Sequence, residues 1–174
     1  SNWKIVGRYD SDDGSKHMGL VILSRKASPF IDQIQSITHQ TLKRESYLQI
    51  QGLIIRMING LNFGFLYCRS TPNNPEIRAI KKYFAECCLL MGDLNLSHRV
   101  DVDRPKIRTL CGEDKFSALS EITISISNNQ LEYILLDEKY KTSFFSFCFH
   151  NFISDHKSIT VRLGLNSNNL TNEI

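Results

Sequence analysis

The stretch CCLLMGDLN, residues 87–95, decides the fold class and raises the question of function. It opens with a short, fully apolar run bounded by Gly92, which is typical of a strand in the centre of a sheet. The run then meets a carboxylate, Asp93, and a carboxamide, Asn95, which an apolar core does not need. A lone G-D-x-N sequence is also a common turn, so other parts of the chain must decide between a turn and a site.

The bulk properties indicate one ordinary globular domain. The chain has 174 residues, of which 41% are hydrophobic and 22% are charged, so wholesale disorder is excluded. It has no apolar run of about 18 residues, so we expect no membrane partner. The formal charge of +3 is compatible with nucleic acid as a partner without requiring it.

The cysteines bear on the compartment. There are five, an odd number, and most lie within apolar stretches, which predicts reduced thiols and an intracellular protein, nuclear or cytoplasmic. The paired C-x-x-C spacing of a zinc site is absent. The chain begins SNWKIVGRYD without an initiator Met, so we expect a processed product, a tagged product or a piece of a longer polypeptide.

The first half of the chain is predicted to be rich in strands. A β-rich run predicts a strand at 18–25, and a polar stretch at 39–46 separates it from the next strands. Residues 47–68 are predicted to form one long β-hairpin, because the Asn-Gly pair at 59–60 is a strong hairpin turn signal.

The segment around residue 87 predicts an α/β fold. Residues 76–86 carry apolar side chains at helical spacing, and the apolar strand at 87–91 follows directly. Strand, loop, helix and strand in this order are typical of α/β proteins. Beyond residue 96 we expect loops with one helical turn up to 115, a brief helix at 114–122, strands at 131–136, 145–150 and 158–165, and a polar tail at 166–174 after a domain spanning 1–165.

Polar residues recur at the ends of the predicted strands. Asp93 and Asn95 follow one strand, Glu132 begins another, and Asp155 and His156 precede the last. Ligands of α/β sheets collect at strand ends, so we expect these five side chains to converge. Carboxylate and amide oxygens suit Mg²⁺ (or Mn²⁺), and a histidine beside a carboxylate is a general acid/base unit. Each of these polar residues, taken alone, also has a structural explanation as part of a turn, an N-cap or the polar face of a strand.

The order of these motifs resembles the endonuclease/exonuclease/phosphatase family, which includes deoxyribonuclease I, exonuclease III-type abasic endonucleases and retrotransposon endonucleases. The matching segments are HMGLVILSR at 17–25, LYCRSTPN at 66–73, GDLN at 92–95, LEYIL at 131–135 and SDH at 154–156. The subgroup that looks most similar is the endonuclease-like domains carried by mobile elements, both retrotransposons and Helitron-type elements. The resemblance implies a four-layered α/β/β/α sandwich of two mixed β-sheets with the site at one rim.

The resemblance also assigns roles to the residues that contact the phosphate. Asp93 matches the residue that orients or deprotonates the attacking water. Asn95 matches the amide that contacts the scissile phosphate, and Tyr67 matches a phosphate-contacting tyrosine. These roles imply hydrolysis of a phosphodiester by in-line attack of water.

The remaining roles fall on the second half of the chain. His156 matches the histidine that polarises the phosphate or acts as the acid/base partner. Asp155 matches a carboxylate on the metal side. Glu132 stands where the family has the aspartate that holds this histidine, and its longer side chain moves the carboxylate by about one methylene.

The chain departs from the family at its start. The family begins with an asparagine-bearing strand and a strand ending in Q-E, whose glutamate is the principal metal ligand, and neither motif occurs in this sequence. We therefore expect the first strands of the family to be missing. The chain would be a fragment of a competent enzyme, a relic without catalysis, or one part of a site that another chain completes.

The resulting expectation is a Mg²⁺-dependent endonuclease that hydrolyses DNA (or RNA) backbone phosphates. A nucleic-acid- or protein-binding module with the same fold, and a phosphatase for small or lipid phosphates, are the alternatives. Substrate contacts are expected in the polar, basic segment at 96–115, which follows Asn95 directly. The basic residues predicted to contact nucleic acid are Arg69, Arg104, Lys106 and Arg108.

Overall fold

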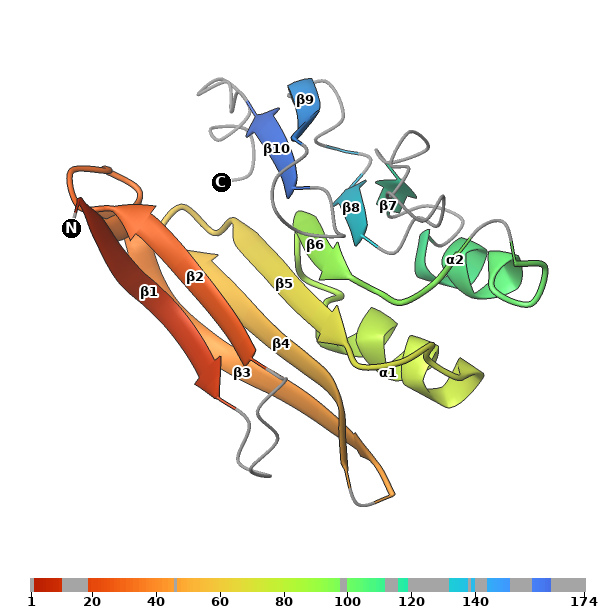
Figure 1. Cartoon of the computed structure of the whole chain (residues 1–174). Helices are drawn as coiled ribbons and strands as arrows, with labels where there is room; N and C mark the ends of the chain where they lie inside the picture. The colour runs from red at the N-terminus through yellow and green to blue at the C-terminus, as the bar shows by residue number, and fades with distance from the viewer. Residues whose placement is uncertain are drawn as a thin grey trace.

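A mixed six-stranded sheet forms the centre of the molecule (Figure 1). The structure is a computed structural model, and it describes residues 2–10, 19–45, 47–97, 100–111, 116–118, 132–137, 139, 144–150 and 158–163. Its elements are β1 Trp3–Asp10, β2 Gly19–Arg25, the 3₁₀-helix η1 Ile31–Gln33, β3 Ile34–Arg44, β4 Tyr47–Met57, β5 Asn62–Cys68, α1 Asn74–Tyr83, β6 Leu89–Asp93, α2 Arg104–Cys111, β7 Phe116–Ala118, β8 Glu132–Asp137, β9 Phe144–His150 and β10 Ser158–Leu163.

The strand order of the central sheet confirms the predicted α/β class. The order is β3-β4-β5-β6-β8-β7, so β6 is an interior strand, as its apolar sequence predicted. Neighbouring strands are antiparallel except β5 and β6, which are parallel and joined through α1. Two further pairs, β1 with β2 and β9 with β10, form separate antiparallel sheets.

The hairpin predicted at 47–68 is confirmed as β4 and β5. Its register pairs Ile50 with Cys68 at one end and Arg56 with Asn62 at the other. The Met57 amide donates a hydrogen bond to the Leu61 carbonyl oxygen and closes the turn, and the Asn59 side chain accepts a hydrogen bond from the Leu61 amide over 3.2 Å. The turn therefore fixes the register that places the far ends of both strands at the candidate site.

Helix α1 begins at Asn74, directly after its capping residue Asn73 and two residues before the predicted start. The Asn73 side chain accepts a hydrogen bond from the Glu76 amide, and the Glu76 carboxylate accepts one from the Asn73 amide, which is a capping box. Pro75 in the first turn favours the same start.

Apolar side chains fill both faces of the central sheet. On one face the helices pack against the strands, and this cluster includes Ile54, Leu66, Leu90 and Leu135 from the sheet and Ile77, Ile80, Phe84 and Leu110 from the helices. On the other face lie Val6 and Ile22 of the β1–β2 hairpin, packed with Ile55, Leu89, Ile134 and Leu136. The described residues thus form three layers of the predicted four: helices, central sheet and β1–β2 hairpin (Figure 1). In the described part of the chain, no helix has the length and apolar character of a membrane span.

Three local predictions were wrong. Residues 39–44 were expected to be a polar separator, but they belong to β3, an edge strand whose outward positions are polar. Residues 116–118, expected within a brief helix, form the edge strand β7, because Phe116–Ala118 pair with β8. The single helical turn expected after residue 96 is an eight-residue helix, α2, anchored by Leu110 in the helix-side core. Strand β1 was not predicted.

Candidate active site

The strand register brings three of the predicted positions side by side. Tyr67, near the end of β5, pairs with Asp93 at the end of β6. Asp93 pairs in turn with Glu132, the first residue of β8. Residues directly opposite each other on neighbouring strands have Cβ atoms about 4.5–5.5 Å apart, so these positions form one row across the sheet.

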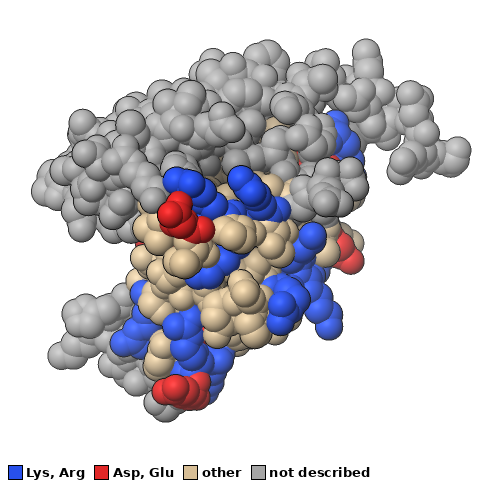
Figure 2. All heavy atoms as spheres, turned by 90° about the vertical axis from the view of Figure 1, so that its right-hand side faces the viewer, with Lys and Arg blue, Asp and Glu red and all other residues tan. Residues whose placement is uncertain are grey.

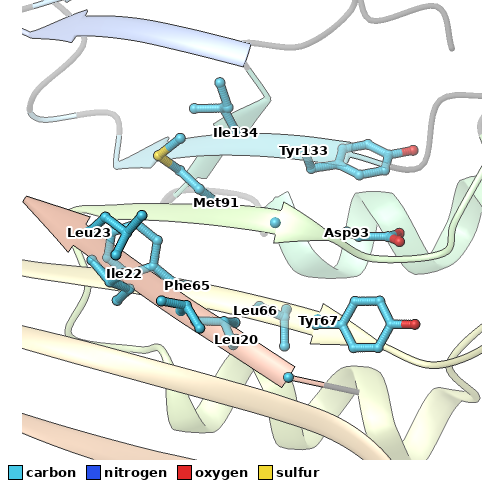
Figure 3. Close-up of a pocket in the computed structure, with 13 residues that line it drawn as sticks. Leu20, Ile22, Leu23, Phe65, Leu66, Tyr67, Met91, Asp93, Tyr133 and Ile134 are labelled. Atoms are coloured by element: carbon cyan, nitrogen blue, oxygen red, sulfur yellow. The ribbon is translucent and has the colours of Figure 1, made fainter. Parts of the chain in front are cut away.

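Tyr67 and Asp93 of this row line a cavity of about 570 Å³ between β2 and the central sheet. Its interior is mainly apolar and is lined by Leu20, Ile22, Phe65, Met91 and Ile134, among others. Figure 3 shows the Tyr67 hydroxyl and the Asp93 carboxylate at the same end of this cavity, pointing in the same direction past the ends of their strands. A polar rim on an apolar pocket is the usual form of a small ligand site.

Strand β6 requires glycine at its penultimate position. Gly92 has a φ of +149°, and a Cβ atom there would lie 1.7 Å from the Leu66 carbonyl oxygen, a backbone atom that cannot move away. No other residue can occupy this position without moving β5 away from β6. The glycine of the GDLN segment therefore has a steric role in presenting Asp93.

Asn95 ties the ends of β5 and β6 together. Its backbone amide donates to Asp93 Oδ1 over 2.8 Å, and its side-chain Nδ2 donates to the Cys68 carbonyl oxygen over 2.7 Å. Its φ of +48° is left-handed, a conformation that asparagine tolerates better than most residues. The side-chain amide predicted to contact phosphate therefore binds the backbone through its nitrogen atom, and its oxygen atom takes no part in this bond.

The environment of Tyr67 raises the pKa of its hydroxyl group. Burial raises the pKa of Tyr67, the nearby Asp93 carboxylate raises it further, and Arg69 acts in the opposite direction. The Arg69 guanidinium is exposed and lies 5.1 Å from the centre of the Tyr47 ring, a cation–π contact at the same rim. The rim therefore offers a phenol donor and a cation to an anionic ligand.

A partly buried ion pair holds the loop between β5 and α1. Arg44 at the end of β3 donates from Nε to Glu76 over 2.8 Å and makes a second, shorter contact with the same carboxylate. It also donates to the Ser70 hydroxyl and to the Thr71 carbonyl oxygen. Burial alone raises the pKa of Glu76, but the hydrogen bonds from Arg44 and the Asn73 amide outweigh it and leave the pKa lowered.

The basic residues of α2 have different surroundings. Arg104 pairs with Asp101 at 3.0 Å, and Arg108 is exposed. Lys106 pairs with Asp103 at 3.0 Å, and their side chains are only 15% and 6% exposed. Asp103 also accepts a hydrogen bond from the Ser97 amide, so Lys106 belongs to a buried polar cluster. Figure 2, which views the side carrying α1 and α2, shows Lys and Arg side chains scattered around an uncharged centre.

The described part of the rim holds a carboxylate, the kind of ligand that hard divalent cations prefer. Asp93 supplies one carboxylate at the rim, and the register puts the position of a second acidic residue, Glu132, opposite it. Searched over the described residues, no group of three or more His, Cys, Asp or Glu side chains forms a metal cluster. The predicted residues Asp155 and His156 and the side chain of Glu132 lie outside the described residues.

Sequence reasoning missed one polar residue beside the site, Gln51. It lies in β4 directly opposite Tyr67 and is fully buried. The alternation in YLQIQGLII was a usable signal, because glutamines at 49 and 51 fall on one face of an otherwise apolar strand. Their position relative to Tyr67 required the register of two strands.

Comparisons with known proteins extend the description of the fold. No protein-family model matches the chain, and no curated protein matches it. Its structure is similar to the endonuclease domain of TRAS1, a telomere-specific non-LTR retrotransposon, with a TM-score of 0.57 and 11% identity over 95% of this chain and 80% of that one. It is also similar to the Haemophilus ducreyi cytolethal distending toxin, with a TM-score of 0.55 and 16% identity over 87% of this chain.

The chain spans 65% of the length of the toxin chain, slightly less than two thirds. At identities of 11% and 16% these similarities establish the fold and not the activity. The chain therefore has a deoxyribonuclease I-like fold, which agrees, at the level of the fold, with the family that its motifs predicted.

Proposed function

We propose that this protein is a metal-dependent phosphodiesterase that hydrolyses DNA backbone phosphates as an endonuclease. The observation that carries the proposal is the arrangement of Tyr67 and Asp93, which lie in register on adjacent strands and point past the strand ends at one end of a cavity. The endonuclease domain named among the structural neighbours supports the same class of substrate, and it supports an origin in a mobile element.

Each residue at the rim would have its own role in phosphodiester hydrolysis. Asp93 would orient the attacking water and accept its proton, and the Tyr67 phenol, whose pKa is raised by its surroundings, would donate a hydrogen bond to a phosphate oxygen. Asn95 would hold Asp93 in place through its backbone amide. Bound Mg²⁺ (or Mn²⁺) would neutralise charge that develops on the phosphate.

The proposed set extends to residues from the second half of the chain. Asp155 would hold the cation, His156 would be the acid/base partner, and Glu132 would hold this histidine. Arg69, at the same rim as Tyr67, is proposed to contact the DNA backbone. Arg104 and Arg108 would extend that contact along α2.

The test is the nicking of supercoiled plasmid by the whole chain, with Mg²⁺ and with EDTA. We expect Mg²⁺-dependent nicking that falls at least 100-fold in Asp93→Asn and about 10-fold in Tyr67→Phe, the size of loss expected for a general base and one hydrogen-bond donor. Asp32→Asn is the matched control, since this exposed aspartate lies in η1 at the opposite end of the sheet.

The outcomes separate the proposal from its rivals. Nicking that Asp93→Asn leaves intact would contradict the assignment of the site. DNA binding that persists in EDTA, without nicking by a folded protein, would identify a binding module instead. Hydrolysis of a soluble phosphate monoester but not of plasmid would identify a phosphatase.

A further inference from the structure

Gln51 is a buried carboxamide without a hydrogen-bond partner in the described part of the chain. It is 0% exposed, and neither its Nε2 nor its Oε1 atom bonds to any residue that the structure describes. A buried donor or acceptor left unpaired destabilises the folded state, so native proteins keep few of them. Such a group needs an explanation beyond the packing of β4.

Gln49, two residues earlier, shows what the same side chain does when its role is structural. It is also 0% exposed and lies on the same face of β4. Its Nε2 donates to the Ser70 carbonyl oxygen over 2.7 Å, and its Oε1 accepts from the Ser70 hydroxyl over 2.9 Å. Both polar atoms are therefore satisfied within the protein, which is the usual state of a buried amide.

The position of Gln51 connects it to the candidate site. It stands opposite Tyr67 on β5, which stands opposite Asp93 on β6, so the three residues form one row on one face of the sheet. On its other side Gln51 pairs with Thr41 of the edge strand β3, which is exposed to solvent. Tyr67 is thus the half-buried polar neighbour within reach, since neighbouring strands are about 4.8 Å apart.

We propose that Gln51 is a positioning residue that acts through Tyr67: its Nε2 donates a hydrogen bond to a water molecule that in turn donates to the Tyr67 phenol oxygen. The phenol O–H is then left to point at the ligand. The contribution to catalysis rests on the proposed function, but the coupling between the two side chains does not.

The coupling is tested by the titration of Tyr67 in the whole chain. The signal is the ¹³Cζ resonance of labelled tyrosine, which is assigned to Tyr67 by its loss in Tyr67→Phe. The groups acting on Tyr67 are Asp93, Arg69 and Cys68, and none of them is changed. A donor to the phenol oxygen favours the phenolate, so we expect Gln51→Leu to raise the pKa of Tyr67.

Matched variants separate this effect from a general loss of structure. Thr41→Val, on the other side of Gln51, and Gln49→Leu should leave the Tyr67 titration where it is. Gln51→Met serves as a second variant if Gln51→Leu does not fold. A Tyr67 titration that is unchanged or shifted downward in a folded Gln51 variant overturns the proposal.

The catalytic consequence is tested by a double-mutant cycle in plasmid nicking. Gln51→Leu should lower the nicking rate about five- to tenfold, the effect of one hydrogen bond, and should cause no further loss in Tyr67→Phe. Equal losses in both backgrounds would show that Gln51 does not act through Tyr67. If the wild-type chain does not nick at all, the proposed function fails while the titration still decides the coupling.

Discussion

Asn95 donates a hydrogen bond from Nδ2 to the Cys68 carbonyl oxygen over 2.7 Å, and this bond joins the end of β6 to the end of β5. The same residue binds the Asp93 carboxylate through its backbone amide. Asn95 therefore controls the relative position of Tyr67 and Asp93, the two described groups of the candidate site that face a ligand. These two hydrogen bonds explain the presence of an asparagine at this position of the GDLN segment without any contact to a substrate.

Substitutions of Asn95 should separate the cost of the lost hydrogen bond from that of the backbone conformation. Asn95→Gly keeps the left-handed φ and loses the bond to Cys68, so we expect it to reduce the free energy of unfolding by about 1 kcal/mol. Asn95→Ala loses the bond and also strains the backbone, so it should cost about 1–2 kcal/mol more than glycine. Urea unfolding measures both, and equal stabilities of the two variants would contradict this account.

The ion pair between Arg44 and Glu76 predicts a second set of stabilities. Glu76→Gln leaves the Arg44 guanidinium without its carboxylate, and we expect a loss of about 2–3 kcal/mol, less than for a fully enclosed pair because Arg44 is 28% exposed. Glu86→Gln is the control, since that carboxylate is 77% exposed and 3.9 Å from Arg56, and it should cost under about 0.5 kcal/mol.

The stability that the Arg44–Glu76 pair contributes should decrease as the pH falls. The pKa of Glu76 is lowered in the folded protein, so its contribution to stability is present above the ordinary carboxyl pKa and is lost as pH falls below it. Wild type should therefore lose more stability than Glu76→Gln between pH 6 and acid pH, when urea unfolding is repeated over that range. Parallel acid profiles for the two proteins would show that the pair does not stabilise the fold.

The sequence predicted the elements whose signals are local. The Asn59–Gly60 turn fixes its hairpin without help from distant residues, and the apolar run before Asp93 has the composition of an interior strand. Strand β3 was missed in part because an edge strand needs apolar side chains on one face only, so His39 to Arg44 looked like a loop. Strand β7 depends on pairing with β8, which no local pattern reports.

The same distinction applies to the site. The positions of Tyr67, Asp93 and Asn95 at strand ends could be predicted, because each strand is terminated by its own sequence. The complete row from Gln51 to Tyr67 to Asp93 could not, because Tyr67 and Asp93 lie 26 residues apart in the chain, on strands that are joined through α1. The bond from Asn95 to Cys68 is equally non-local.

Cys68 should make the fold sensitive to alkali. Burial raises the pKa of the Cys68 thiol, with a further contribution from Asp93, so the folded protein keeps it protonated above the pH at which an exposed thiol ionises. Its contribution to stability is complete below about pH 8.5 and is lost as pH rises, by about 2 kcal/mol at pH 10. Urea unfolding at pH 7 and pH 10 should show a smaller alkaline loss in Cys68→Ala than in wild type. The same loss in both would mean that this thiol ionises normally in the fold.

Lys106 and Arg108, two residues apart on α2, should respond in opposite ways to substitution. Lys106 is paired with the buried Asp103, so Lys106→Ala should lower the free energy of unfolding by about 2–3 kcal/mol. Arg108 is exposed, so Arg108→Ala should leave stability within about 0.5 kcal/mol and weaken DNA binding. The two measurements are urea unfolding and DNA binding in EDTA at several salt concentrations.

The salt dependence identifies the kind of DNA contact that is lost. Removing one phosphate contact reduces the slope of log binding constant against log salt by about 0.9, and we expect this change for Arg108→Ala. Lys106→Ala should keep the wild-type slope at a temperature where it is folded, because its ammonium group is committed to Asp103. A reduced slope for Lys106→Ala with unchanged stability would reverse the assignment, making Lys106 the DNA contact and its pair with Asp103 dispensable.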